Sequence, residues 1–385
     1  MTAFFLAVLV AYALVQLLIY WKLRQACAGR RACHFAAIAF LLLLNGVLIL
    51  SRVLRAWGLP GAEVAAMLGR SWLAVSMWLA LIGALAGLWN TAVRLASRLG
   101  RDVRWLLIRP RPLVAGAAVV MACLCVWGVF EAGDIRLETL VVRTRRLPAG
   151  SKPVRVVQLS DLHLGAQMGQ GRLAAILDRV REARPDLLVF TGDFVDGAGP
   201  HVDRLVRQVA ELDAPLGKFA VTGNHEFYLG LPLAEQFLRD GGFRLLRGES
   251  VKVAEHLVVA GVDDIAGQWL GAAASTDEDV ALPGGLYPRF TILLKHQPLI
   301  NHSVLGRFDL QLSGHTHGGQ VFPGRWLVQI FYPYIAGRYE LPGGATLYVS
   351  RGAGTFGPPL RVFAPPEVTL ILIEPMAAPS LQPLP

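Results

Sequence analysis

The chain has 385 residues, of which 54% are apolar and only 17% are charged, and it carries a net charge of +9. The apolar excess lies in the first third, which excludes a wholly soluble chain and indicates a membrane part followed by a soluble part. Most basic residues of that third flank apolar runs, where anionic lipid explains them, so we expect no nucleic-acid partner.

Four segments are long and apolar enough to cross the hydrocarbon core of a bilayer, and each should be a helix. They are Ala3–Tyr20, Phe35–Leu50, Trp72–Trp89 and Leu113–Phe130. We therefore expect a bundle of about four transmembrane helices over residues 1–132, with the lipid bilayer as a partner. Gln16 and Asn45 lie inside these runs and are suited to bonding a second helix.

Basic residues flank the spans unevenly. Four follow the first span and six follow the third, whereas the loop after the second span holds three. Because cytoplasmic loops carry the excess of Lys and Arg, the first and third loops should be cytoplasmic. We therefore expect a multi-pass protein of the inner (cell) membrane whose C-terminal domain is extracytoplasmic.

All four cysteines precede residue 126. Cys27 and Cys33 lie near a membrane boundary, and Cys123 and Cys125 lie inside an apolar run. We expect them to be small buried hydrophobic residues. The soluble part has no cysteine, so it has neither a disulfide nor a thiolate metal site.

The soluble part begins near residue 133 and reads as short strands and helices. We predict an edge strand over 137–145, a buried strand at Val154–Leu159 and an amphipathic helix at 171–184. Further strands are expected at 186–190, 218–221, 243–246, 257–262, 291–294, 309–312, 346–349 and 368–373, with helices at 202–212 and 233–239.

This order of elements predicts the fold class. Early alternation of strands and helices followed mainly by strands indicates an α/β fold of two packed sheets flanked by helices, over residues 133–375. Residues 376–385 are rich in Ala and Pro, so we expect a disordered tail there.

Five polar clusters each follow a predicted strand. They are Asp161-Leu162-His163, Gly192-Asp193, Gly223-Asn224-His225-Glu226, His296 and Gly314-His315-Thr316-His317. Strand ends meet at one rim of a sheet, so these clusters can converge. Histidine, aspartate and asparagine offer nitrogen and oxygen ligands, which suit divalent Mn, Fe, Zn or similar ions.

Local spacing within the clusters has physical reasons. In an extended chain, side chains two residues apart point the same way, as expected for Asp161 with His163 and for His315 with His317. The glycines before Asp193, Asn224 and His315 should permit tight turns and close approach by substrate.

Taken in order, these clusters resemble the calcineurin-like metallophosphoesterase superfamily, with its pattern D-x-H, G-D, G-N-H-E, a single H and G-H-T-H. Gly318-Gly319-Gln320 and Ser350-Arg351-Gly352 resemble a membrane-associated branch, which includes enzymes similar to UDP-2,3-diacylglucosamine pyrophosphohydrolases. The resemblance implies a two-sheet sandwich flanked by helices, in four αββα layers.

The resemblance also implies a centre of two divalent metal ions. Asp161, His163 and His317 would hold the first ion, Asn224, His296 and His315 the second, and Asp193 would bridge both. His225 would be catalytic, as general acid or phosphate-binding group, and would hold no metal.

The implied activity is that of a membrane-anchored, metal-dependent phosphoric ester hydrolase, a phosphodiesterase or phosphatase. A hydroxide bridging the two metals would attack phosphorus while His225 protonates the leaving oxygen. A phosphodiester, with a lipid-linked substrate as one option, would explain the anchor and suggests lipid metabolism. The alternative is a non-catalytic membrane receptor or scaffold with a metal-binding domain.

Two polar residues near the motifs have two readings each. Glu226 either orients a ligand or forms a simple salt bridge. Arg351 either meets a phosphate or forms a structural ion pair. The acids Asp196, Asp263 and Asp264 are expected to be solvated turn residues.

An aromatic group follows the last metal motif. It comprises Phe322, Trp326 and the run from Phe331 to Tyr334. Ordinary packing in the domain and contact with the membrane interface or a lipid groove are both open.

Overall fold

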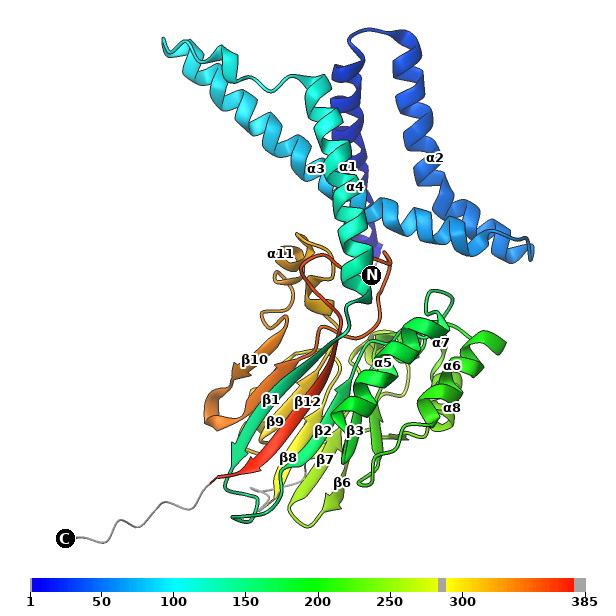
Figure 1. Cartoon of the computed structure of the whole chain (residues 1–385), viewed down its shortest axis with the longest axis vertical. Helices are drawn as coiled ribbons and strands as arrows, with labels where there is room; N and C mark the ends of the chain where they lie inside the picture. Colours follow the sequence, from blue (N-terminus) through cyan, green and yellow to red (C-terminus); the bar gives the residue numbers. More distant parts are fainter. Residues whose placement is uncertain (1, 283–288, 377–385) are drawn as a thin grey trace, which may run out of the picture. The chain divides into compact units, whose positions relative to one another are not determined.

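The structure is a computed structural model that describes residues 2–282 and 289–376. The chain divides into two compact units (Figure 1). The membrane unit comprises Met1–Val129 with Gly357–Leu360, and the C-terminal unit comprises Phe130–Phe356 with Arg361–Pro385. The expected disordered tail lies outside the described residues, apart from Met376.

Long helices make up the membrane unit. They are α1 (Thr2–Cys27), α2 (Arg31–Ala56), α3 (Ala62–Arg98) and α4 (Pro110–Gly133), with the short 3₁₀ helix η1 (Arg104–Leu106) before α4. Among the described residues, three stretches are long and apolar enough to cross a membrane, namely Arg31–Ala56, Ala62–Arg98 and Arg104–Gly133. These contain the second, third and fourth predicted spans, and α1 contains the first.

Polar side chains join α1 to α2. The Asn45 side-chain amide donates to Gln16 Oε1 at 3.1 Å, and the Tyr12 hydroxyl donates to Asn45 Oδ1 at 2.5 Å. A bilayer core offers no water to such groups, so the bonds favour one pairing of the two helices. The expectation that Gln16 and Asn45 bond across helices is confirmed.

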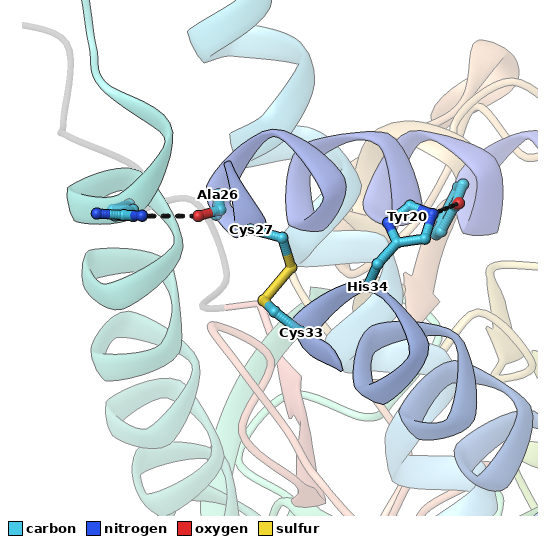
Figure 2. Close-up of a disulfide and its surroundings, with 6 residues drawn as sticks. Tyr20, Ala26, Cys27, Cys33 and His34 are labelled. Atoms are coloured by element: carbon cyan, nitrogen blue, oxygen red, sulfur yellow. Dashed lines mark hydrogen bonds between the residues drawn. A yellow bond between two sulfur atoms is a disulfide. The ribbon is translucent and has the colours of Figure 1, made fainter. Parts of the chain in front are cut away.

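A disulfide closes the turn between α1 and α2 (Figure 2). It joins Cys27, the last residue of α1, to Cys33 in the first turn of α2, with Cα atoms 5.5 Å apart. The prediction of small buried hydrophobic residues is therefore wrong for this pair, because the tight turn brings the two sulfurs together. It is also wrong for α4, where Cys123 is exposed and Cys125 is half-buried.

The start of α4 lies at the same end of the membrane unit as the turn between α1 and α2. Arg111 Nε, in the first turn of α4, donates to the carbonyl of Ala26 at 3.2 Å, next to the disulfide (Figure 2). The α1–α2 turn and the beginning of α4 therefore lie at one end of the helices. Residue Gly133, where α4 ends, lies at the other end of that helix.

The C-terminal unit contains two six-stranded sheets (Figure 1). The first has the order β1-β12-β2-β3-β4-β5. Its strands are β1 (Arg136–Thr144), β2 (Val154–Leu159), β3 (Leu187–Thr191), β4 (Lys218–Val221), β5 (Arg244–Leu245) and β12 (Glu367–Pro375). From β2 to β5 neighbours are parallel, whereas β12 runs antiparallel to β2. The predicted edge strand is confirmed, because β1 is outermost.

The second sheet has the order β10-β11-β9-β8-β7-β6. Its strands are β6 (Glu249–Ala254), β7 (Leu257–Gly261), β8 (Phe290–Leu294), β9 (Leu310–Ser313), β10 (Gly337–Glu340) and β11 (Thr346–Val349). Strands β7, β8, β9 and β11 are parallel, and β6 and β10 pair antiparallel at the two edges. Neither edge strand was predicted, because both are only partly buried and lack a continuous apolar run.

Helices and loops cover the outer faces of the sheets. The first sheet carries α5 (Gln170–Ala183), α6 (Pro200–Ala210), α7 (Asn224–Leu229) and α8 (Leu231–Asp240). Around the second sheet lie α9 (Ala266–Trp269), α10 (Glu278–Ala281), α11 (Gly324–Val328) and the 3₁₀ turns η2 (His302–Val304), η3 (His317–Gly319) and η4 (Pro342–Gly344).

Apolar side chains fill the spaces between these layers. One cluster joins the first sheet to its helices, where Leu173, Ile176 and Leu177 of α5 are buried as their spacing predicts. A second cluster joins the inner faces of the two sheets, with Val189 of β3 and Ile292 of β8 both buried. Each such side chain contributes about 1.5–3 kcal/mol to folding. The predicted fold class, two packed sheets flanked by helices, is confirmed.

Candidate metal centre

Five strands end next to the polar clusters. In the first sheet β2, β3 and β4 lead to Asp161, Asp193 and Asn224, and in the second sheet β8 and β9 lead to His296 and His315. Within each sheet these strands are parallel, so their carboxyl ends share an edge. We call this edge, where the two sheets meet, the metal rim. It brings together all seven residues predicted as ligands.

Asp161, His163 and His317 form a first group at the rim. The Nε2 atoms of the two histidines are 3.1 Å apart, and His317 Nε2 lies 3.4 Å from Asp161 Oδ1. All three side chains are buried, and their candidate ligand atoms lie within 4.8 Å of one another. These separations suit the ligands of one cation.

Asn224, His296 and His315 form a second group. His296 Nε2 lies 3.2 Å from both Asn224 Oδ1 and His315 Nδ1. Asp193 Oδ2 is 3.2 Å from the same His296 atom and 3.8 Å from His163 Nε2 in the first group. The Asp193 carboxylate therefore lies between the two groups.

The charges of these groups fit divalent cations. Burial raises the pKa of the Asp161 carboxyl. Burial also lowers the pKa of His315 to about 3 and that of His317 well below its usual range. Neutral imidazoles at His315 and His317 match the form in which histidine binds metal. At His296 burial lowers the pKa, but the charge of Asp193 raises it well above its usual range. A cation offsets the burial of the acids. The residues present therefore fit the two implied ions.

The backbone at the rim is strained. Asp161, His163, Asp193, His315 and His317 all adopt positive φ, between 50° and 70°. This left-handed conformation costs non-glycine residues about 1–3 kcal/mol each, and functional sites are where it persists. The prediction that Asp161 and His163, or His315 and His317, point the same way along an extended chain is therefore wrong. Tight left-handed turns, rather than the pleat of a strand, direct these side chains.

Two glycines permit the close approach of the clusters. A Cβ atom on Gly314 would lie 1.9 Å from Ser160 Oγ and 2.3 Å from Asp161 Oδ2. One on Gly223 would lie 2.2 Å from Asp193 Oδ1. The glycines thus make room for the chain's own polar groups, whereas the sequence had suggested room for substrate.

Asp196 connects a predicted ligand to the predicted catalytic histidine. Its Oδ1 atom accepts a hydrogen bond from His163 Nδ1 at 2.7 Å and lies 2.8 Å from His225 Nδ1. Both rings then keep Nε2 for other partners, as a ligand and a proton donor require. Asp196 is an exposed residue of the turn after β3, as predicted, and its carboxylate nevertheless contacts both histidine rings.

The surroundings of His225 favour its charged form. Burial lowers the pKa of His225, but the hydrogen bond to Asp196 and the charge of Asp193 raise it to about 9. His225 therefore carries a proton at neutral pH and can donate it. One ring nitrogen of His225 also lies within 4.8 Å of candidate ligand atoms of His163 and Asp193.

Glu226 holds the backbone around Asp193. Fully buried, its carboxylate accepts hydrogen bonds from the backbone N–H groups of Asp193 at 2.9 Å, Phe194 at 2.7 Å and Gly223 at 2.6 Å. Of the two readings of Glu226, orientation of a ligand agrees with these contacts, since they fix the two turns that carry Asp193 and Asn224.

A chain of hydrogen bonds begins at His315 Nε2 and orients the ring. Tyr332 Oη lies 2.9 Å from His315 Nε2 and donates to Gln297 Oε1 at 2.9 Å. Gln297 Nε2 in turn donates to Asp264 Oδ1 at 2.9 Å. This chain assigns the proton of His315 to Nε2 and leaves Nδ1 for a metal.

Two predicted turn acids are in fact buried. Asp264 ends the chain of bonds from His315, and Asp263 accepts from the Thr222 hydroxyl at 2.9 Å and from Arg247 Nε at 3.0 Å. The expectation of solvated turn residues is therefore wrong for both. The sequence carried no local signal for this, because their partners lie far away along the chain.

Two arginines near the rim serve the framework. Arg351 lies 2.6 Å from both Glu138 and Glu367, which agrees with its reading as a structural ion pair. Arg361 is completely buried and donates to the carbonyls of Gly352 at 3.1 Å and Gly354 at 2.7 Å. Sequence reasoning missed Arg361, which holds the loop beside His317.

Comparison with known proteins is independent of the geometry of the rim. The sequence profile described as calcineurin-like phosphoesterase matches residues 154–319. An uncharacterized metallophosphoesterase of Aquifex aeolicus (strain VF5) is 43% identical over 245 residues, which cover 63% of this chain and 94% of that protein.

Further relatives are similar, and one of them is named as a transmembrane protein. A transmembrane protein with metallophosphoesterase domain from Bos taurus is 32% identical over 312 residues, covering 75% of this chain and 69% of that protein. An uncharacterized metallophosphoesterase of Campylobacter jejuni is 33% identical over 230 residues, covering 59% of this chain and 61% of that protein. Among solved structures, the Thermus thermophilus sulfate thiohydrolase SoxB aligns at 15% identity with a TM-score of 0.36, over 59% of this chain and 57% of that chain.

Proposed function

The chain belongs to the calcineurin-like phosphoesterase family, and we propose that it is a membrane-anchored phosphoesterase that hydrolyses phosphodiesters with two divalent metal ions. Membrane association agrees with its long apolar helices. The family supports a phosphoesterase hydrolase, and the number of metals, the diester preference and the substrate are the parts that we add.

The position of Asp193 carries this proposal. Its carboxylate lies between the two ligand groups, 3.8 Å from His163 Nε2 and 3.2 Å from His296 Nε2. A carboxylate shared by two N/O ligand groups is the arrangement that two-metal hydrolases use to hold paired cations.

The chemistry divides between the ions and the chain. When bound, two divalent cations neutralise charge on the phosphoryl oxygens and activate water. Asp161, His163 and His317 would hold one ion, and Asn224, His296 and His315 the other, with Asp193 in contact with both.

His225 would supply the proton. Asp196 orients its ring, and the carboxylates around it keep the imidazole protonated at neutral pH. A proton donor at this place can protonate the leaving oxygen or hydrogen-bond the phosphoryl group. This pair is the observation that favours an enzyme over a non-catalytic receptor or scaffold, which would need ligands but no positioned acid.

A direct assay tests the proposal. The purified full-length chain, stripped with a chelator and reloaded with Mn²⁺, Zn²⁺ or Fe²⁺, should hydrolyse a soluble aryl phosphodiester, and faster than the matching monoester. Metal content measured in parallel should approach two ions per chain. A fully loaded chain that cleaves neither ester would favour the scaffold instead.

For the location, we propose the inner (cell) membrane, with the spans within residues 1–132, an extracytoplasmic catalytic domain at 133–375 and a tail at 376–385. The unequal loop charges support this orientation. The disulfide between Cys27 and Cys33 points the other way, since it lies in the first loop, which these charges assign to the reducing cytoplasm. The loop charges set the orientation while the helices insert into the membrane. The compartment that the loop then occupies decides whether the two thiols are oxidised, so we follow the charges.

A further inference from the structure

One face of the C-terminal unit gathers large apolar side chains that the fold leaves exposed. Trp326 is 59% exposed, Ile330 72% and Phe331 66%, and Phe363 on a separate segment is 67% exposed. With Leu327, they form what we call the α11 surface, after the short helix α11. Exposed apolar side chains gathered in this way mark an interaction site, whereas single ones need no explanation. Of the two readings of the aromatic group, ordinary packing fails for Trp326 and Phe331.

The two segments of the α11 surface are joined firmly. The Phe322 N–H donates to the Val362 carbonyl at 3.1 Å, and the Val362 N–H donates to the Gln320 carbonyl at 2.9 Å. The ring of Phe322 contacts Trp326 at 5.1 Å and Phe363 at 5.7 Å between centroids. The exposed side chains therefore belong to one continuous and well-supported surface.

A hydrogen bond ties the α11 surface to the end of a membrane span. The Phe363 N–H donates to Glu131 Oε2 at 3.0 Å, and Glu131 lies in the last turn of α4. The stretch Arg104–Gly133 is long and apolar enough to cross a bilayer. A span passes from hydrocarbon to headgroups at its end, so Phe363 lies near that level.

The composition of the α11 surface suits the boundary between hydrocarbon and headgroups. Tryptophan and other amphipathic aromatic residues gather where hydrocarbon meets headgroups. Arg325, exposed on α11, adds a cation that can meet lipid phosphates. These features and the link to α4 favour lipid over a protein as the occupant.

The α11 surface also adjoins the metal rim. Phe331 is followed by Tyr332, whose hydroxyl lies 2.9 Å from the predicted ligand His315. Gln320, which pairs with the Phe363 segment, accepts a hydrogen bond from the Phe356 N–H at 2.9 Å. The ring of Phe356 lies 4.9 Å from that of His225. One network of contacts thus connects the exposed apolar side chains to the candidate proton donor.

We propose that the α11 surface enters the headgroup region of the bilayer and presents the metal rim to phosphoesters carried by lipids. The second half of this inference rests on the proposed function and names its substrate class. A lipid phosphate lies at the level where the surface would dock, so the ester reaches the rim without its tail leaving the membrane.

Fluorescence of a single labelled position tests the docking without any activity. The full-length chain with Cys27→Ser, Cys33→Ser, Cys123→Ala and Cys125→Ala would carry Ile330→Cys, labelled with an environment-sensitive dye, in single-copy nanodiscs. The matched control is Val280→Cys on α10, where the parent side chain is 64% exposed. We expect emission at shorter wavelength and quenching by spin-labelled lipid at position 330, and neither at position 280.

Activity on two substrates tests the consequence. The double variant Trp326→Ser with Ile330→Ser would be compared with Val280→Ser in nanodiscs that contain a phosphodiester lipid with a fluorescent headgroup. Burial of one large apolar side chain is worth enough to change an equilibrium roughly tenfold. We expect a loss of that size on the lipid substrate and an unchanged rate on a soluble aryl phosphodiester.

Each outcome decides something distinct. A water-like signal at position 330 overturns the docking, and so does a shift that occurs only in nanodiscs with two copies, which would indicate self-association. Equal losses on both substrates would overturn the role in lipid access. If the wild type cleaves neither substrate while position 330 is quenched by lipid, the proposed function fails and the docking stands.

Discussion

The metal rim and the α11 surface both break the usual rule of burial, in opposite directions. The rim buries Asp161, Asp193 and His296, whereas the α11 surface exposes Trp326 and Ile330. Elsewhere in the C-terminal unit, the strands bury most of their Val, Leu and Ile side chains. Buried charge requires a compensating partner, and exposed apolar surface requires a cover. The difference teaches that the two regions need different partners, and we propose cations for the rim and lipid for the α11 surface.

Replacing the shared carboxylate should test the rim most severely. Asp193→Asn keeps the shape but removes the charge that both ligand groups face. We expect turnover of a soluble aryl phosphodiester to fall by roughly a thousandfold or more, because several kcal/mol of charge stabilisation depend on the paired metals. Metal analysis of the variant should show fewer bound ions. Full activity with full metal content would refute the bridging role.

Removing the proton donor should have the next largest effect. For His225→Ala we expect a fall of about 10²–10⁴-fold in kcat, the usual range for a general acid. The metal content should stay at the wild-type level, which separates this variant from Asp193→Asn. A variant that loses its metal instead would assign His225 to the ligands.

Asp196→Asn should weaken the rim without dismantling it. We expect a decrease of about 10–100-fold, as for other residues that orient a metal ligand. Against the lowering effect of burial, the Asp196 hydrogen bond and the charge of Asp193 raise the pKa of His225 to about 9, so wild-type activity should fall as the pH rises through that region. Loss of the carboxylate lowers this pKa, so the alkaline limb of the pH–kcat profile should move to lower pH. An unmoved limb would show that His225 is not the group that titrates.

Stability should separate the α11 surface from the core. Ile330→Ser should change the free energy of unfolding by less than about 0.5 kcal/mol, because its side chain is already exposed. Leu177→Ala on α5, a buried position of similar size, should cost about 2–5 kcal/mol. Thermal unfolding of the full-length chain, followed by near-UV circular dichroism, gives both values. A large loss for Ile330→Ser would mean that the surface packs against the protein after all.

The cysteine pair should have the smallest effect on catalysis. Cys27→Ser should leave phosphodiesterase activity unchanged, since the pair lies in the membrane unit. If the first loop is cytoplasmic, both thiols should react in intact cells with a membrane-permeant maleimide before any reductant is added. A pair that reacts only after reduction would place the first loop on the oxidising side. With four spans the C-terminus would then face the cytoplasm, and a reporter that works only in the cytoplasm should be active when fused there.

Much of the rim could be predicted from the sequence, because its signals are local. Each cluster directly follows an apolar strand, and parallel strands bring their ends to one edge whatever the rest of the chain does. The same holds for α5, whose buried side chains follow the helical period. The order of the motifs and their family resemblance were therefore sufficient to select the seven residues that meet at the rim.

Other features depended on partners distant in the chain, so only the tertiary structure decided them. Asp196, although exposed, contacts two histidines from separate segments, and Asp264 is buried where Gln297 donates to it. The aromatic residues near α11 have the composition of a core, and only the absence of covering side chains on Trp326 and Ile330 distinguishes them. Periodicity records what a segment can bury, whereas the folded chain determines which of those side chains find a neighbour.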